Sequence, residues 1–235
     1  MNTERQEILQ KLMHNPGMKF NELWGNVGES NKFAYHLKVL VEDGLIEKKD
    51  EFYSLTHEGK TFSTYLEGTD GSRAKFPALI VACVIYDKES DKYLFSRRTK
   101  EPFYGYWCWT SGKVRIDEFI YETAKKEIFE ETGLTCDLEL KGLLSAKTYD
   151  NNEFSYNHEI LVVLGKNPKG DLIPKTREGE IFWLSEKEIL EKKAIPTISD
   201  VLEISKSKSF KWIEVNRLQE NDKFVGKKIL RDIEF

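Results

Sequence analysis

The hydrophobic positions of the first 44 residues recur mainly with the period of a helix. The clearest run consists of Ile8, Leu9, Leu12 and Met13. The breaker at residues 15–17 ends this run, and a second short helix is expected near residues 20–26. A third helix should start at the N-cap Ser30 and end at Gly44, since glycine is a common helix terminator. The start of the chain is therefore predicted to be helical.

The pattern changes to alternation after the third helix. Residues 45–47 and 52–55 alternate like two strands around the polar turn 48–51. Thr56 should then cap a last helix that reaches about Leu66. This segment is predicted to be a small, mostly helical domain with one hairpin.

From Phe76 onward, strand-like runs dominate, with single helices between them. The predicted strands are 78–86, 93–96, 138–147 and 160–164, and the predicted helices are 117–132, 186–192 and 198–205. Strands mixed with helices that pack on their faces indicate an α/β (α+β) domain in which a mixed sheet lies between helices.

The small polar segment 68–72 resembles a linker in composition. We therefore expect one domain at residues 1–70 and a second at 71–235. The second domain would include a C-terminal extension, residues 206–235. Its apolar pattern suggests added strands or a dimer arm.

Charge is distributed unevenly between these two parts. The whole chain has a net charge of −4, and residues 1–70 hold eight Lys/Arg against twelve Asp/Glu, which accounts for all of it. No global attraction to nucleic acid is expected, so DNA binding would need a local basic surface.

The compartment follows from the cysteines and the apolar runs. Cys83, Cys108 and Cys136 form no C-x-x-C pair, and we interpret them as reduced thiols rather than zinc ligands or disulfides. The longest apolar stretch, 77–86, is about half of what a bilayer crossing needs, and residues 1–5 lack an export core. We expect a cytoplasmic protein without a membrane partner.

Three carboxylates carry the chemistry of the predicted helix 117–132. Glu127, Glu130 and Glu131 stand at i, i+3 and i+4, so they share one helical face and repel each other unless a cation joins them. Hard oxygen ligands in a partial cage suit Mg²⁺ or Mn²⁺, which share their remaining coordination with substrate phosphates. On the other side, Ile120, Ala124 and Ile128 should hold the helix on the sheet.

Residues 112–118 and 126–134 resemble the signature of the Nudix hydrolases. That signature is a glycine, five residues, a glutamate, seven residues, then Arg-Glu-apolar-x-Glu-Glu-x-Gly-apolar, and here it runs from Gly112 through Glu118 to Leu134. The departure is Lys126 in place of arginine, which cannot reproduce a bidentate fork. The resemblance spans roughly residues 76–205 and implies a Nudix α/β/α sandwich.

The resemblance also implies roles for particular residues. Glu130 and Glu131 would bind metal, Glu127 would bind metal or deprotonate water, and Glu118 would support the loop. The backbone carbonyl of Ser111 would be a further metal ligand. The implied reaction is metal-assisted cleavage of a diphosphate linkage in a nucleoside diphosphate derivative such as ADP-ribose.

Other positions are candidates for completing the site. An acid from a later loop often does so in the family, and here Glu178 is preferred over Glu180. Aromatic rings can stack on a base and a guanidinium can hold a phosphate. The predicted substrate-binding residues are Arg97, Tyr149, Phe154 and Tyr156.

The N-terminal segment resembles the winged-helix regulators of bacteria and archaea. The resemblance rests on residues 33–40, 43–46 and 53–56. It implies that the third helix enters the major groove of DNA while the wing touches the backbone. The implied DNA contacts are Ser30, Asn31, Lys32, Tyr35, His36, Lys38, Lys48 and Lys49. We also expect a homodimer, which would double the number of phosphate contacts.

Two other functions fit parts of the sequence. One is a transcription regulator whose Nudix domain senses a nucleotide and hydrolyses little or none of it. The retained glutamates argue against this function, and Lys126 in place of arginine favours it. The other is an isopentenyl-diphosphate isomerase, which shares the fold. The sequence has no evident cysteine–glutamate proton-transfer pair for that reaction.

Overall fold

The computed structural model describes residues 3–15, 17–67, 72–73, 76–99 and 103–235. The chain divides into two compact units, Met1–Phe76 and Pro77–Phe235. In the described part of the chain, no helix is long and apolar enough to cross a membrane.

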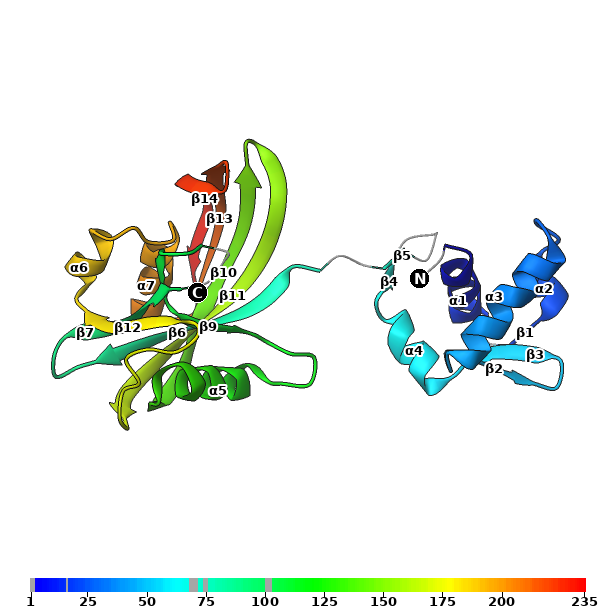
Figure 1. The fold of residues 1–235 in the computed structure, drawn as a ribbon, viewed down its shortest axis with the longest axis horizontal. Coiled ribbons are helices and arrows are strands. Elements are labelled where there is room, and N and C mark those ends of the chain that lie inside the picture. The colour runs from blue at the N-terminus through cyan, green and yellow to red at the C-terminus, as the bar shows by residue number, and fades with distance from the viewer. Residues whose placement is uncertain (1–2, 16, 68–71, 74–75, 100–102) are drawn as a thin grey trace. The chain divides into compact units, whose positions relative to one another are not determined.

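The first unit is a bundle of short helices beside a small sheet (Figure 1). Its elements are α1 (Thr3–His14), β1 (Met18–Lys19), α2 (Phe20–Trp24), α3 (Ser30–Glu42), β2 (Ile46–Lys49), β3 (Phe52–Leu55), α4 (His57–Ser63), β4 (Leu66–Glu67) and β5 (Ser72–Arg73). The strands β1, β3 and β2 form an antiparallel sheet in that order. Its core includes Ile8, Leu9, Leu12, Leu23, Leu37 and Leu40.

Three details of this unit differ from the sequence-based expectation. Glu29, not Ser30, is the N-cap of α3. Strand β1 was not expected, because its two residues carry no alternation of their own and gain their hydrogen bonds only from β3. The last helix ends at Ser63 rather than near Leu66, although Thr56 caps it as expected, with the Gly59 amide donating to its hydroxyl over 2.9 Å.

The second unit is built on one mixed sheet. Its elements are β6 (Ala78–Asp87), β7 (Lys92–Arg98), β8 (Trp107–Cys108), β9 (Thr110–Lys113), α5 (Ile120–Thr132), β10 (Thr135–Asp150), β11 (Glu153–Lys169), β12 (Gly179–Leu184), α6 (Glu186–Leu190), α7 (Ile198–Lys206), β13 (Lys211–Glu220) and β14 (Lys223–Glu234). Among the described residues the strand order is β12-β7-β6-β11-β10-β13-β14, with β8 paired to β7 and β9 paired to β6. The sheet mixes parallel and antiparallel pairs.

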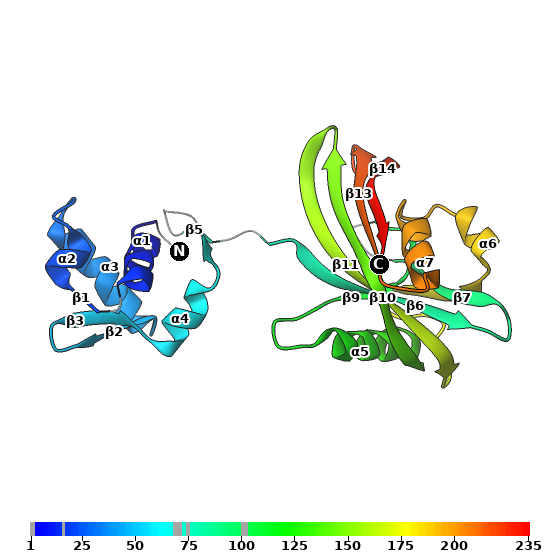
Figure 2. The same cartoon turned by 180° about the vertical axis from the view of Figure 1, so that it is seen from behind.

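Helices cover both faces of this sheet. Helix α5 lies on one face, and α7 lies on the other face (Figures 1 and 2). Ala124 and Ile128 of α5 pack on Val81 and Cys83 of β6, while Val201 of α7 belongs to the core on the opposite side. The expected α/β architecture with a mixed sheet between helices is confirmed.

The long hairpins of the sheet turn at asparagines with positive φ. Asn151 and Asn152 have φ of 49° and 68° between β10 and β11, and Asn221 and Asp222 have 51° and 62° between β13 and β14. Asparagine and aspartate tolerate this left-handed backbone, which matches the twist of a tight hairpin. The strands therefore continue up to these turns and are longer than expected. The C-terminal extension forms the second hairpin, with β13 parallel to β10.

Candidate functional site

Helix α5 begins later than its sequence pattern suggested. The expected start was residue 117, but Phe119 is an extended N-cap whose amide donates to the Glu122 carboxylate over 2.8 Å. The helix ends at Gly133, which has φ of 74° and donates to the Phe129 carbonyl. Glu118 consequently lies in the loop before the helix, whereas Glu127, Glu130 and Glu131 lie on it.

The contact between β9 and α5 depends on Gly112. A β-carbon added to Gly112 would lie 2.2 Å from Cδ of Glu127 and 2.3 Å from its Cγ. Atoms cannot approach that closely, so only glycine lets the half-buried Glu127 side chain lie against β9. The contact fixes the side chain relative to the sheet.

Glu131 is the most buried carboxylate of this helix, with 9% of its surface exposed. Burial, and after it the charges of Glu127 and Glu178, raise the pKa of Glu131 to about 8. A backbone hydrogen bond from Ser111 and the charge of Arg98 oppose this rise in pKa. Burial also raises the pKa of Glu127, against the opposing charge of Lys126 and with support from Glu130, Glu118 and Glu178.

These effects identify which later acid approaches the helix. Glu178 lies before β12, where its amide donates to the Thr176 hydroxyl over 3.2 Å, and its charge acts on both Glu127 and Glu131. Glu180 instead accepts from Arg97 over 2.6 Å and from Lys175 over 3.4 Å. These charge effects, and the pairing of Glu180 with basic residues, support Glu178 as the candidate for the acidic group.

Lys126 forms an ion pair with Glu118. Its Nζ donates to Oε1 of Glu118 over 2.7 Å, and the Thr123 hydroxyl donates to Oε2 over 3.0 Å. The hydrogen bond from Lys126 holds the pKa of Glu118 below its ordinary value. A lysine at this position therefore still orients a carboxylate, and that carboxylate is Glu118.

The donor set of this region consists of oxygens. Glu127, Glu130, Glu131 and Glu178, with the Ser111 backbone, offer hard ligands of the kind that Mg²⁺ and Mn²⁺ prefer. Burial, and after it the repulsion among these acids, raises the pKa of Glu127 and Glu131, and a divalent cation would relieve that repulsion. In the described part of the chain, however, no three His, Cys, Asp or Glu side chains are arranged as a finished metal cage.

The four expected substrate-binding residues fall into separate sets of contacts. Arg97 pairs with Glu180 on β12. Tyr149 packs on Phe154 with ring centroids 5.9 Å apart, at the tip of the β10–β11 hairpin. Tyr156 packs instead on His158, 5.1 Å between centroids. Arg97, the Tyr149–Phe154 pair and Tyr156 thus have different partners among the described contacts.

One residue near the acids was not anticipated. Arg98 follows Arg97 on β7, and its side chain hydrogen-bonds Cys108 and lowers the pKa of Glu131. Successive strand residues face opposite sides of a sheet, so only one of the two arginines could face the acids. The alternation was readable from the sequence, but which face holds the acids was not.

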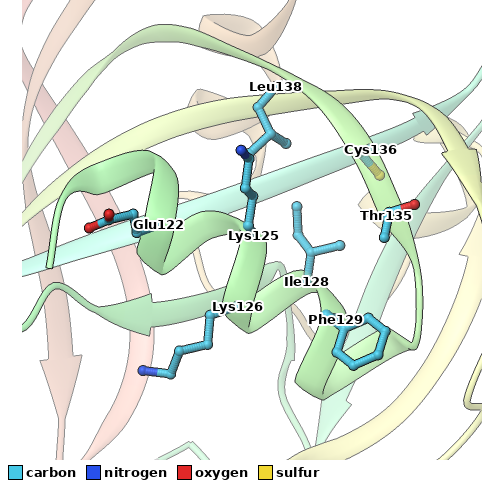
Figure 3. A pocket seen from close by; sticks show the side chains of 8 residues that line it. All are labelled: Glu122, Lys125, Lys126, Ile128, Phe129, Thr135, Cys136 and Leu138. Carbon is cyan, nitrogen blue, oxygen red and sulfur yellow. The ribbon is translucent and has the colours of Figure 1, made fainter.

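A groove of about 530 Å³ lies between α5 and the start of β10 (Figure 3). It is lined by Glu122, Lys125, Lys126, Ile128, Phe129, Thr135, Cys136 and Leu138. Of the metal-ligand candidates Glu127, Glu130 and Glu131, none lines it. Its largely apolar walls do not suit a diphosphate, so we do not place the reaction there.

The expected DNA contacts of the first unit differ in exposure. Tyr35 is 58% exposed, whereas His36 is only 5% exposed, with Nε2 3.6 Å from Glu4. His36 therefore does not present its side chain to a groove, because it packs against α1. Basic residues form ion pairs within the unit: Lys32 with Glu4, Lys38 with Glu42, and Lys49 with Glu47. Lys48 lies over the Tyr53 ring, and Ser30 and Asn31 form the first turn of α3.

Comparison with known proteins agrees with this division of the chain. A family model described as NUDIX domain matches residues 77–203, more than half of the chain. A model described as a domain of unknown function (DUF7347) matches residues 1–66.

Solved structures resemble the second unit. The mutator MutT protein from Bacillus halodurans is 22% identical, with a TM-score of 0.53 over 65% of this chain and 97% of that one. The NUDIX domain of NrtR from Shewanella oneidensis, determined with ADP-ribose, is 17% identical, with a TM-score of 0.48 over 56% and 88%. The MutT protein from Methanosarcina mazei Go1 is 25% identical, with a TM-score of 0.46 over 56% and 94%. The similarity to the Bacillus halodurans protein supports the fold of the second unit and says nothing about its substrate.

Proposed function

Because the chain belongs to the Nudix hydrolase family, we propose that it is a pyrophosphohydrolase that uses Mg²⁺ or Mn²⁺ to cleave a diphosphate linkage in a nucleoside diphosphate derivative. The proposal rests on the acidic group of Glu127, Glu130, Glu131 and Glu178, in which burial and then the neighbouring charges raise the pKa of Glu127 and Glu131. Acids crowded in this way are the arrangement that binds cations and phosphates together.

Each residue of the site has a role in this proposal. Glu130, Glu131 and Glu178, with the Ser111 carbonyl, would hold the cations, and Glu127 would hold a cation or accept the proton of the attacking water. Bound cations would supply charge neutralisation for the diphosphate. Glu118 would orient the loop through Lys126, since the two are joined by a 2.7 Å hydrogen bond.

A product-release assay tests this function. A panel of nucleoside diphosphate derivatives, ADP-ribose among them, is incubated with the full chain and Mg²⁺ or Mn²⁺. We expect Glu131→Gln and Glu127→Gln to lower kcat by at least roughly a hundredfold while the melting temperature stays close to that of the wild type.

The matched control is Glu122→Gln on the same helix. Its new amide oxygen can still accept from the Phe119 amide, so the helix cap survives and activity should be unchanged. If the wild-type chain releases no product from any substrate with either cation, the hydrolase proposal is wrong. In that case a change of DNA binding on addition of nucleotide would favour the alternative, a nucleotide-sensing regulator.

We further propose that the first unit is a winged helix that binds DNA. The observation that favours this is the element order α1, β1, α2, α3, β2, β3, α4 with the sheet order β1-β3-β2, which leaves Tyr35 and Lys38 of α3 exposed. As a homodimer the protein would present two such helices. Because Lys32, Lys38 and Lys49 are already paired with acids, affinity for each copy should be low and should fall as salt is added.

Fluorescence anisotropy with duplex DNA tests this second function. Lys38→Ala and Lys48→Ala should weaken binding and reduce its salt dependence, since each removes a phosphate contact. Lys125→Ala on α5 in the second unit is the control. Equal binding by all variants, or none at low salt, would contradict a DNA-binding role.

A further inference from the structure

Arg217 on β13 is a charged residue in the interior of the second unit. Only 2% of its surface is exposed. Its Nε donates to the Thr148 hydroxyl over 2.9 Å, and Nη2 lies 2.9 Å from Nδ1 of His158. Arg217 belongs to the C-terminal hairpin, outside the part of the chain that the family model matches.

Aromatic rings surround this guanidinium. Its Cζ lies 5.5 Å from the centroid of Tyr156 and 6.0 Å from that of Phe224. Phe103 packs on Phe224 with centroids 5.1 Å apart. Ring faces attract a cation, but they neither accept its remaining hydrogen bonds nor neutralise its charge.

Arg217 has no acidic partner among the described residues. Its described hydrogen-bond partners are Thr148 and His158, so two of its five N–H groups have acceptors, and no carboxylate is among the groups that shift its pKa. Burial lowers the pKa of Arg217, and the positive charge remains because arginine pKa values are so high. A buried charge without a counter-ion is costly, so an anion from outside the protein would stabilise this guanidinium.

The neighbouring groups are also hydrogen-bond donors. Because Arg217 donates to Nδ1 of His158, the ring carries its proton on Nε2. Burial, with the charges of Arg217 and Lys113, lowers the pKa of His158 to about 4, so the ring is neutral at pH 7. The guanidinium and the imidazole N–H suit an anionic, acceptor-rich group.

The position of this cluster relates it to the acidic site. His158 pairs with Ala78 on β6, and three residues further along β6, Val81 pairs with Gly112 on β9. Two strand spacings and three residues correspond to roughly 14 Å along the sheet. This separation is within the reach of a nucleotide, although the cluster faces the α7 side and a ligand would have to pass the edge at β9.

We propose that Arg217 and His158 form a subsite for a phosphate monoester on the substrate, separate from the diphosphate that is cleaved. The inference rests on the proposed hydrolase function for its substrate class. Tyr156 and Phe224 would hold the guanidinium in place beside that phosphate.

Binding of inorganic phosphate to the full chain without divalent cations tests the subsite alone. In the presence of a chelator, the acidic group holds no divalent cation and repels phosphate. Only the cluster of Arg217 and His158 can then bind it. We expect phosphate to raise the melting temperature of the wild type, compared with chloride at equal ionic strength, and not that of Arg217→Met. Methionine has a similar length, so without phosphate this variant should fold and melt no lower than the wild type.

Two further variants keep the outcome decisive. Lys228→Met removes a charge from the exposed part of the same hairpin and should respond to phosphate like the wild type. Arg217→Lys retains the charge, so it should respond more weakly than the wild type even if Arg217→Met does not fold. An absent response in the wild type, or equal responses in the wild type and the Arg217 variants, would mean a structural cation only and would overturn the proposal.

Kinetics distinguish a substrate phosphate from free phosphate as the ligand. Two substrates are compared that differ only in a phosphate monoester on the ribose. In the wild type, the substrate with the monoester should have a KM roughly ten- to a hundredfold lower, and in Arg217→Met the two KM values should be equal. If phosphate binds but the KM values of the two substrates are equal in the wild type, free phosphate is the ligand and the substrate assignment is wrong. If neither substrate is cleaved while phosphate still binds, the hydrolase function fails and the anion site stands.

Discussion

The side chain of Glu127 lies against Gly112 and leaves no room for a β-carbon at residue 112. In Gly112→Ala, the new methyl group would lie 2.2 Å from Cδ of Glu127, so this carboxylate must move away from β9. Displacing a catalytic group by about 1 Å costs roughly a hundredfold in rate. We expect kcat/KM for the cleaved nucleotide to fall by about that factor, as measured by product release in Mg²⁺.

Gly226→Ala is the control for the general effect of losing a glycine. Nothing lies within 4 Å of a β-carbon at Gly226, and this residue is on β14, away from α5. Its activity should equal that of the wild type. Equal activity of Gly112→Ala and Gly226→Ala would show that the position of Glu127 does not limit the reaction.

His158 gives the second unit a dependence on pH. Between about pH 4 and 6.5 the unfolded chain holds a proton on this ring that the folded chain does not, because the folded pKa is about 4. Stability is therefore complete above pH 6.5 and is lost as the pH falls towards 4. His158→Gln cannot titrate, and its amide oxygen can still accept from Arg217.

Urea unfolding at pH 7 and pH 4.5 measures this difference. On going to pH 4.5 the wild type should lose at most about 2 kcal/mol more than His158→Gln. Comparing the two chains removes the acid sensitivity of all other groups. Identical losses would mean that His158 titrates normally in the folded protein.

At the scale of elements, the end of α5 is set by Gly133. Its φ is 74°, and an added β-carbon would lie 2.5 Å from the Asp171 carbonyl oxygen and 3.0 Å from Cγ1 of Ile173. Left-handed backbone and a backbone clash both disfavour alanine here. Gly133→Ala should destabilise the second unit by about 2 kcal/mol or more in urea unfolding.

A glycine with the same φ but free space separates these two causes. Gly105 has φ of 78° with nothing within 4 Å of an added β-carbon. Gly105→Ala should therefore cost only the backbone strain, about 1 kcal/mol. If Gly133→Ala destabilises the second unit no more than Gly105→Ala does, the close contact with Asp171 does not contribute to ending α5 at this residue.

The sequence predicted the elements better than their lengths. Helical spacing identified α5, because Ala124 and Ile128 lie on the side of the helix that packs on the sheet and the glutamates lie on another side. The hairpin β10–β11 is longer than predicted because the turn at Asn151 lets polar positions stay in the ladder. Alternation within one strand does not reveal how far a partner strand extends its pairing.

At the scale of the whole molecule, the two units have separate cores. The core of the first unit contains residues from Ile8 to Leu66, and the two cores of the second begin at Ile80. Each should therefore fold without the other. We expect residues 77–235, expressed alone, to hydrolyse the same nucleotide with an unchanged kcat.

A substitution in the full chain gives the matched comparison. Leu9 is fully buried in the first unit, and Leu9→Ala should cost that unit roughly 2–5 kcal/mol. Hydrolysis by this variant should stay at the wild-type level, while the DNA binding that we propose for the first unit should be lost. If Leu9→Ala and the isolated second unit both lose hydrolysis, the first unit takes part in the reaction.

Local order along the chain was enough to determine that Glu127, Glu130 and Glu131 share a helix face and that strands and helices alternate after residue 76. Periodicity and helix geometry act over a few residues, so one stretch of sequence contains them. Only the tertiary structure decided that the charge of Glu178 rather than that of Glu180 acts on Glu131, that Lys126 pairs with Glu118, and that Arg217 lies buried beside His158. The pairs that cross the sheet depend on strand order and register. These are fixed by packing between segments tens of residues apart, which no local pattern specifies.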